Sequence, residues 1–262
     1  MGGCLVFFGF IATLAVYLFL DHVVRGWLLA HPNTWHRRPW VNGFRQLGKA
    51  NVVIWLLLLW SCITDRWRPT FVTIIALILV SLCVCPLKGL VQRRRPLMLA
   101  AASGSSAPRE QGDSWLRRVS FPSGDTAVAF AVAVVLPFFV GRPWRPILLA
   151  VAGGIGLLRV TSSVHYPSDV VAGAVIGVAC GLCAMRTAPR WGQRDPFPVK
   201  GWWRLVVGLI LVLVLPLVSP LVGLESLPIF LRIYGIPLAG LILVYLGGRG
   251  RVMGGTGNCD RM

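Results

Sequence analysis

Long uncharged runs alternate with basic segments along this chain. Eight uncharged runs occur, at residues 1–20, 50–64, 69–87, 126–141, 146–158, 170–185, 205–224 and 233–248. A helix needs about 20 apolar residues to cross the hydrocarbon core of a bilayer, and flanking Arg or Trp side chains can extend a shorter run to the interface. The pattern therefore predicts an all-α, polytopic membrane helix bundle with about eight spans.

The composition agrees with a membrane protein. Charged residues make up only 13% of the 262 residues, and 56% are hydrophobic. A soluble domain of this size would need more charge to cover its surface. We expect a single transmembrane domain over residues 1–248 and a Gly-rich, flexible tail over residues 249–262. No basic segment precedes the first run, so we interpret it as a retained span and not as a cleaved signal peptide.

The charge balance indicates the partners. The net charge is +17, from 26 Lys and Arg against 9 Asp and Glu. In a soluble protein such an excess would suggest nucleic acid. Here the basic residues lie between apolar runs, where lipid headgroups and lipid phosphates are nearer, so we expect membrane lipids and no nucleic acid. For any single Arg outside the motifs below, the positive-inside rule for cytoplasmic loops is an equally good explanation.

Polar motifs stand at the ends of four consecutive runs. They are Lys88 and Arg95 after the third run, Ser123 to Asp125 before the fourth, Arg159 after the fifth, and His165 with Asp169 before the sixth. If the third run ends on one face of the membrane, the fourth begins there, the fifth returns there, and the sixth begins there again. Counting crossings therefore places all four groups on one side.

The residues on that side fit a phosphate group. Lys88, Arg95 and Arg159 supply positive charge. An Arg can bind a phosphate through two parallel hydrogen bonds, whereas a Lys attracts it as a point charge. Ser123 and Gly124 stand where a helix begins, so unpaired backbone N–H groups and the helix dipole favour an anion there. Taken singly, these motifs could be a plain helix cap or membrane-surface anchors. Their occurrence together favours a phosphate-binding site.

His165 and Asp169 form the candidate catalytic pair. Asp169 lies four residues after His165, in the first turn of the sixth run, and can accept a hydrogen bond from one ring nitrogen. The other nitrogen is then free to attack phosphorus; a purely structural hydrogen bond is the simpler alternative for this pair. Asp125 and Asp169 are outnumbered by the three cations on this side, which suits an anion and not Mg²⁺, so we expect no metal and no cofactor.

Three segments together resemble a known family. Lys88-x6-Arg95-Pro96, Pro122-Ser123-Gly124-Asp125 and Arg159-x5-His165-x3-Asp169 resemble the signature motifs of the type 2 phosphatidic acid phosphatase family, whose soluble branch, the vanadium haloperoxidases, binds vanadate in the same cradle. The resemblance covers about residues 50–185, so the last two runs, within residues 205–248, lie outside it. It implies a six-helix core, lipid phosphate or diphosphate substrates and no metal.

The resemblance also implies roles for individual residues. His165 would form a phosphohistidine, and Asp169 would orient it. The phosphate oxygens would be held by Lys88, Arg95, Ser123, Gly124 and Arg159. The basic residues divide almost equally between the two sides of the membrane, so charge does not fix the orientation. The family pattern alone places the active site toward the outside or a lumen.

The chain departs from the family pattern at two positions. Leu158 stands where Ser is usual, and Asp125 stands where a His usually acts as general acid. A diphosphate leaves as a weakly basic lipid phosphate and needs less help from an acid than a monoester does. We therefore predict a metal-independent membrane phosphohydrolase for a lipid phosphate or diphosphate, preferably polyprenyl diphosphate, with Asp125 as the third catalytic residue. The alternatives are a lipid phosphotransferase using the same site and a catalytically weak, lipid-phosphate-binding pseudoenzyme.

Overall fold

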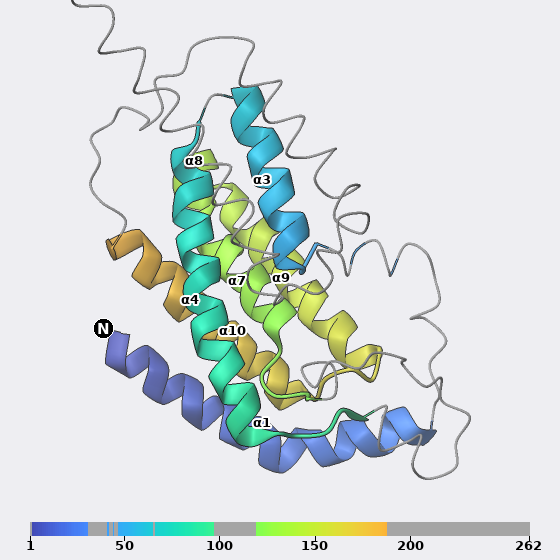
Figure 1. Ribbon diagram of the computed structural model, residues 1–262. Coiled ribbons are helices and arrows are strands. Elements are labelled where there is room, and N and C mark those ends of the chain that lie inside the picture. Colours follow the sequence, from blue (N-terminus) through green and yellow to red (C-terminus); the bar gives the residue numbers. More distant parts are fainter. Residues whose placement is uncertain are drawn as a thin grey trace, which may run out of the picture. The chain divides into compact units, whose positions relative to one another are not determined.

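The computed structural model describes residues 2–30, 41, 44, 47–64, 66–96 and 119–187 (Figure 1). The main elements are α1 (Gly2–Ala30), α3 (Ala50–Thr64), α4 (Arg68–Val91), α7 (Gly124–Val135), α8 (Pro137–Val140), α9 (Trp144–Thr161) and α10 (Pro167–Thr187). Within these ranges there is no strand, and the only β-type pairing is an isolated antiparallel bridge between Arg94 and Val119. The all-α prediction is confirmed.

Several helices, α1 and α4 among them, are longer than the uncharged runs that predicted them. The first run ends at residue 20, but α1 continues past Asp21 to Ala30, and the third run ends before Lys88, which lies in the last turn of α4. Both charged side chains are buried. A charge that points into the protein does not end a helix, so the first charged residue is a poor marker of a helix end.

Four helices are long and apolar enough to cross a membrane, by length and composition. They are α1, with its apolar window at Phe7–Val24, and α4, α9 and α10. Two further apolar segments, Ala50–Ser61 and Gly124–Val140, are shorter. These features are those of a membrane protein. The number of eight spans stays a prediction, because the runs at 205–224 and 233–248 and the tail at 249–262 lie outside the described residues.

The chain divides into two compact units. The smaller contains Asn51–Ile74 among the described residues, and there the start of α4 is joined to α3: Ser61 Oγ is hydrogen-bonded to Thr70 Oγ1, which also donates to the Leu57 carbonyl oxygen at 3.1 Å. The larger unit is Met1–Ala50 with Ile75–Thr187 and contains every predicted site residue. The expectation of one transmembrane domain over residues 1–248 stays a prediction.

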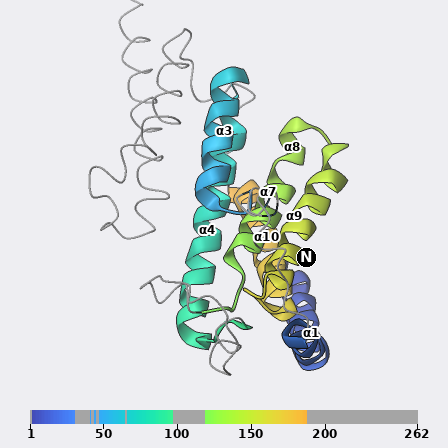
Figure 2. The same ribbon diagram turned by 90° about the vertical axis from the view of Figure 1, so that its right-hand side faces the viewer.

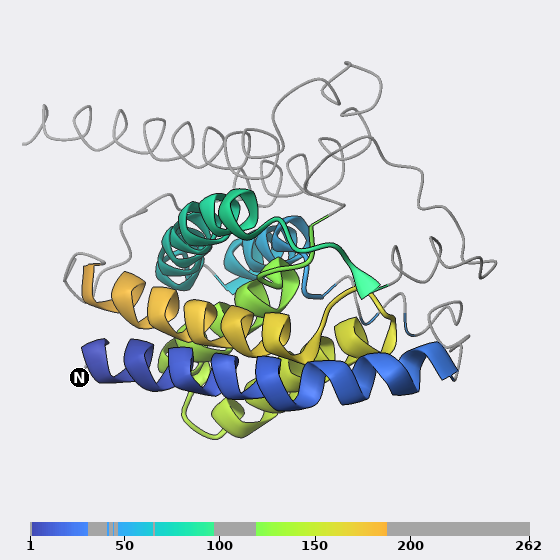
Figure 3. The ribbon, with the colours of Figure 1, turned by 90° about the horizontal axis from the view of Figure 1, so that it is seen from below.

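Helix α10 is the packing centre of the larger unit. It packs against α7 and against α1, and α7 packs in turn against α9 (Figure 1). Seen from below, α1 and α10 run side by side in opposite directions (Figure 3). The chain reverses between α8 and α9 (Figure 2), where Gly141 adopts a φ of 116° that favours glycine.

Glycines allow α7 and α10 to approach closely. Gly173, Gly177 and Gly181 are spaced four apart along α10, so they form one stripe. A Cβ atom at Gly173 would overlap the carbonyl oxygen of Ser123, and one at Gly177 would overlap that of Ala127. The backbone at the start of α7 is therefore positioned directly by the surface of α10.

We predict that Gly173→Ala destabilises the protein. The added methyl group would force α10 away from Ser123, at a cost of about 1–3 kcal/mol for overpacking. The matched control is Gly153→Ala on α9, because no atom lies within 4 Å of a Cβ built there. Thermal unfolding in detergent should show a lowered midpoint for the first variant and an unchanged midpoint for the second. Equal midpoints would contradict the close contact.

Candidate active site

The segment after α4 is paired with the segment before α7. Gln92, at a φ of 45°, ends α4, and the chain then runs extended toward Pro96, as a residue before proline prefers. The Ser120 N–H donates to the Arg93 carbonyl oxygen at 2.7 Å, next to the bridge between Arg94 and Val119. This pairing brings the basic motif to the start of α7, although the two are separated by more than 20 residues of chain.

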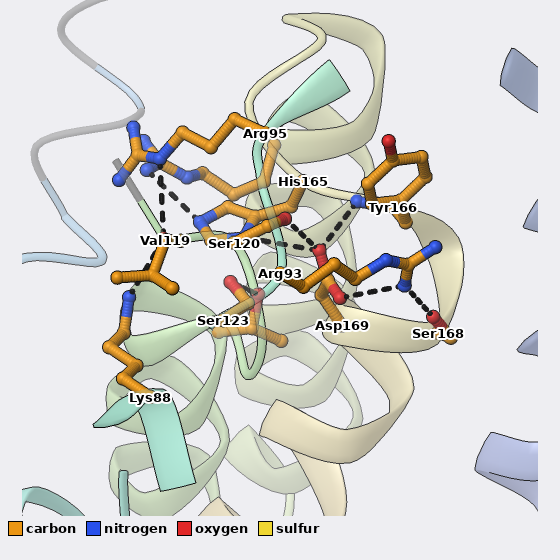
Figure 4. Close-up of polar contacts among 12 residues, drawn as sticks. Lys88, Arg93, Arg95, Val119, Ser120, Ser123, His165, Tyr166, Ser168 and Asp169 are labelled. Carbon is orange, nitrogen blue, oxygen red and sulfur yellow. Dashed lines mark hydrogen bonds and ion pairs between the residues drawn. The ribbon is translucent and has the colours of Figure 1, made fainter. Parts of the chain in front are cut away.

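Two cations converge on one carbonyl oxygen. Lys88 Nζ and Arg95 Nε both lie 3.4 Å from the Val119 oxygen (Figure 4). Lys88 is buried in the last turn of α4, and Arg95 is half-buried in the extended segment. The two side chains thus point from different segments to the same place.

Arg159 connects the remaining groups. It lies buried in the last turn of α9. Its Nη1 forms an ion pair of 3.1 Å with Asp125 Oδ2, and its Nη2 lies 3.5 Å from His165 Nε2. Its main-chain carbonyl oxygen accepts the N–H groups of Val164 and His165, at 3.2 and 3.3 Å. One residue therefore holds the backbone of the histidine turn and faces the Nε2 side of its ring.

His165 lies buried between Arg159 and Asp169. Its Nδ1 is 3.6 Å from Asp169 Oδ2, which is an ion-pair distance but longer than a hydrogen bond. Burial lowers the pKa of His165 to about 4; the charges of Arg159 and Arg95 act in the same direction, and the Asp169 carboxylate acts against them. The imidazole is therefore neutral near pH 7, with Nε2 directed at the guanidinium of Arg159.

Asp169 is fully buried in the first turn of α10 and accepts several hydrogen bonds. Its Oδ2 accepts from Ser120 Oγ and from the Tyr166 N–H at 2.8 Å, while its Oδ1 accepts from Arg93 Nη1 at 3.1 Å (Figure 4). Its main-chain carbonyl oxygen accepts the Ser123 N–H at 3.0 Å. The residue that faces His165 thus also anchors the start of α7.

Ser123 and Gly124 form the start of α7. Ser123 is the N-cap and is buried, and its hydroxyl is hydrogen-bonded to Thr126 Oγ1 at 2.8 Å. Gly124 and Asp125 are the first two residues of the helix, where backbone N–H groups have no partner within the helix. All eight predicted site residues lie around these contacts, while their place on one side of a membrane and their roles stay predictions.

Sequence reasoning missed four residues of this site. Arg93, Ser120, Asp21 and Ser168 all hydrogen-bond to Asp169 or to its partners. For Arg93 a signal existed: alternate residues of an extended segment point the same way, so Arg93 and Arg95 should face one side and Arg94 the other. Arg94 is indeed exposed. Asp21 directly follows the first uncharged run, so the pattern of runs gives no signal that it lies in a helix.

The comparison with known proteins supports the family resemblance. The sequence profile of the PAP2 superfamily matches residues 69–193, which contain all three motifs. Over these residues the chain is similar to the PAP2 superfamily. This confirms the resemblance to type 2 phosphatases.

Two curated relatives match shorter parts. The bacitracin transport permease protein BcrC of Bacillus licheniformis is 40% identical over 72 residues, which are 27% of this chain and 34% of that protein. The decaprenylphosphoryl-5-phosphoribose phosphatase of Mycobacterium tuberculosis is 32% identical over 95 residues, 36% of this chain and 48% of that protein. The matches thus span less than half of either relative.

A solved structure shares the fold of this chain. The first transmembrane PAP2 type phosphatidylglycerolphosphate phosphatase from Bacillus subtilis superposes with a TM-score of 0.54 at 18% identity. The superposition covers 73% of this chain and 98% of that chain. At this identity the likeness concerns the fold alone.

Proposed function

We propose that this chain is a membrane lipid phosphatase in which His165 is the nucleophile. The observation that carries the proposal is the environment of His165. A buried imidazole, neutral near pH 7, directs Nε2 at the guanidinium of Arg159, with Asp169 on the other side of the ring. A neutral imidazole has the free electron pair that attack on phosphorus requires.

The reaction has two steps. In the first, His165 Nε2 forms a bond to phosphorus and the bond from phosphorus to the lipid oxygen breaks, so that oxygen must gain a proton unless it leaves as a stable anion. Asp169, on the Nδ1 side, stabilises the positive charge that the ring gains. In the second, water attacks the phosphohistidine, which releases inorganic phosphate and restores the neutral imidazole.

The charges around His165 suit a phosphate group. Lys88, Arg95 and Arg159 are three cations from three different segments, and the start of α7 adds its dipole and the N–H groups near Gly124. Such a set can stabilise a phosphoryl group through electrostatics without a metal ion. We therefore propose metal-independent catalysis, with Lys88, Arg95, Ser123, Gly124 and Arg159 as phosphate ligands.

An apolar groove beside the site supports a lipid substrate. The groove has a volume of about 790 Å³ and lies between α1, α4 and α10. Most of its lining is apolar, including Phe10, Leu14 and Val175. The groove also reaches Ser168 and Arg93, and Arg93 donates a hydrogen bond to Asp169. A hydrocarbon chain in this groove would keep its phosphate near the site. The Mycobacterium tuberculosis phosphatase described above also has a lipid-linked phosphate in its name.

We predict that His165→Ala reduces phosphate release by at least about 1000-fold, as expected for loss of a nucleophile. The matched control is His22→Ala, because His22 lies exposed on α1.

The measurement is phosphate release from a panel of lipid monophosphates and diphosphates and one short-chain, water-soluble phosphate ester, with and without EDTA. We expect the control and the EDTA sample to stay active and the soluble ester to be a poor substrate. An active His165→Ala variant would refute the proposed nucleophile.

A preference for diphosphates is the finer proposal. Asp125 stands where the family usually has a His, and its Oδ2 is paired with Arg159 Nη1 at 3.1 Å. A carboxylate in an ion pair accepts hydrogen bonds and is a poor proton donor. A monoester must expel a strongly basic alkoxide, whereas a diphosphate expels a weakly basic lipid phosphate. We therefore propose polyprenyl diphosphate or a similar lipid diphosphate as the preferred substrate.

The Asp125 proposal predicts a selective gain. Asp125→His should raise kcat/KM more for a lipid monophosphate than for the diphosphate with the same chain, because an imidazolium can protonate the alkoxide. Asp125→Asn is the control, since it removes the charge without adding a proton donor at neutral pH. A wild type that prefers the monophosphate, or equal gains on both substrates, would contradict the leaving-group argument. A wild type that binds lipid phosphate without turnover would instead favour the pseudoenzyme.

We further propose that the site faces outside or into a lumen, as the family pattern suggests. Single cysteines at residues 105 and 190, in a cysteine-free background, lie on the two predicted opposite sides. We expect an impermeant thiol reagent to label intact cells at residue 105 and not at residue 190. Labelling at residue 190 alone would reverse the orientation.

A further inference from the structure

Arg93 and Asp21 form a partly buried ion pair that the proposed reaction does not use. Arg93 Nη2 lies 2.7 Å from Asp21 Oδ2, and Asp21 is only 3% exposed. Asp21 also accepts the N–H and the hydroxyl group of Ser168, at 3.0 and 2.5 Å. The carboxylate of α1 is thus fixed to the first turn of α10.

Arg93 joins this carboxylate to the one that faces His165. Its other terminal nitrogen, Nη1, donates to Asp169 Oδ1 at 3.1 Å and to Ser168 Oγ at 2.8 Å (Figure 4). The guanidinium carbon lies 3.6 Å from the centre of the Tyr166 ring and 5.0 Å from that of Tyr17. Because the guanidinium is planar and stacked, the two carboxylates are held at a fixed spacing.

This arrangement also affects the charge that His165 experiences. The charged groups around the imidazole are Asp169, Arg159 and Arg95. Arg93 contacts Asp169 and not His165, so it offsets part of the negative charge that faces the ring. Loss of Arg93 would leave both Asp169 and Asp21 without their cation. The ring would then bind a proton more readily, and a protonated imidazole cannot attack phosphorus.

We propose that Arg93 is a positioning residue which, anchored by Asp21 of α1, aims Asp169 at His165 and offsets part of the Asp169 charge. The kinetic consequence rests on the function proposed above, while the structural consequence does not. The proposal assigns α1 a part in the chemistry of the site, although α1 contributes no residue to the three motifs.

A histidine titration tests the proposal without relying on activity. The ring nitrogens of His165 would be followed by NMR in protein labelled with 15N-histidine, and assigned by the loss of their signals in His165→Ala. We expect His165 in the wild type to titrate near pH 4, and in Arg93→Gln at a pH about one unit higher. The matched control is Arg94→Gln, because Arg94 is exposed, and its titration should equal the wild type. An unchanged titration in Arg93→Gln would overturn the proposal.

The pH dependence of phosphate release gives a second readout. We expect Arg93→Gln to lower kcat by about 10–100-fold, as for other residues that orient a catalytic group, and to move the acid limb of kcat/KM to higher pH. Arg93→Lys keeps the charge but not the planar fork, so kcat should fall while the acid limb stays near its wild-type position. If the role of Arg93 were merely structural, both substitutions would lower kcat equally, and the acid limb of kcat/KM would stay at the same pH in both variants.

Asp21 is tested through Arg93. If Asp21 acts through Arg93, the double variant Asp21→Asn/Arg93→Gln should lose no more activity than Arg93→Gln alone. Losses that multiply would show that Asp21 acts independently. A wild type that releases no phosphate from any lipid would refute the proposed function, and the NMR titration would still decide the role of Arg93.

Discussion

The buried carboxylate of Asp169 is the contact on which the site depends. Its side chain accepts hydrogen bonds from Ser120, Arg93 and the Tyr166 N–H, its main-chain carbonyl oxygen accepts one from Ser123, and it faces His165. A buried charge is stable only when it is well paired. The site therefore forms only when all of these segments are in place. The segment after α4, the segment before α7 and the turn before α10 therefore meet at this one residue.

Much of the fold and site follows from the sequence because it depends on local patterns. Uncharged runs predict helices. Counting crossings predicts that Lys88, Arg159 and His165 lie on the same side of the membrane, and in the structure these residues lie together around the site. The glycine stripe of α10 predicts a close helix contact, which α7 makes through its carbonyl groups. These inferences need only the order of spans and the size of side chains.

The missed residues depend on contacts between distant segments. Ser120 has no sequence signal beyond its neighbours, yet it hydrogen-bonds to Asp169 because the segment before α7 pairs with Arg93 and Arg94. The partner of Asp125 was likewise unpredictable, because no rule of spacing relates the start of α7 to the end of α9. Sequence identifies which residues carry charge, while packing decides which charges are paired.

The pairing of Asp21 has a consequence for how the protein is made. Asp21 lies 72 residues before Arg93 and 147 before Ser168, so during synthesis α1 emerges long before either partner. A carboxylate without a partner opposes transfer of a helix into the bilayer, although the window Phe7–Val24 that contains Asp21 is apolar overall. Stable insertion of the first helix is therefore coupled to the arrival of α10, and the ribosome must translate more than half of the chain before α1 gains its final environment.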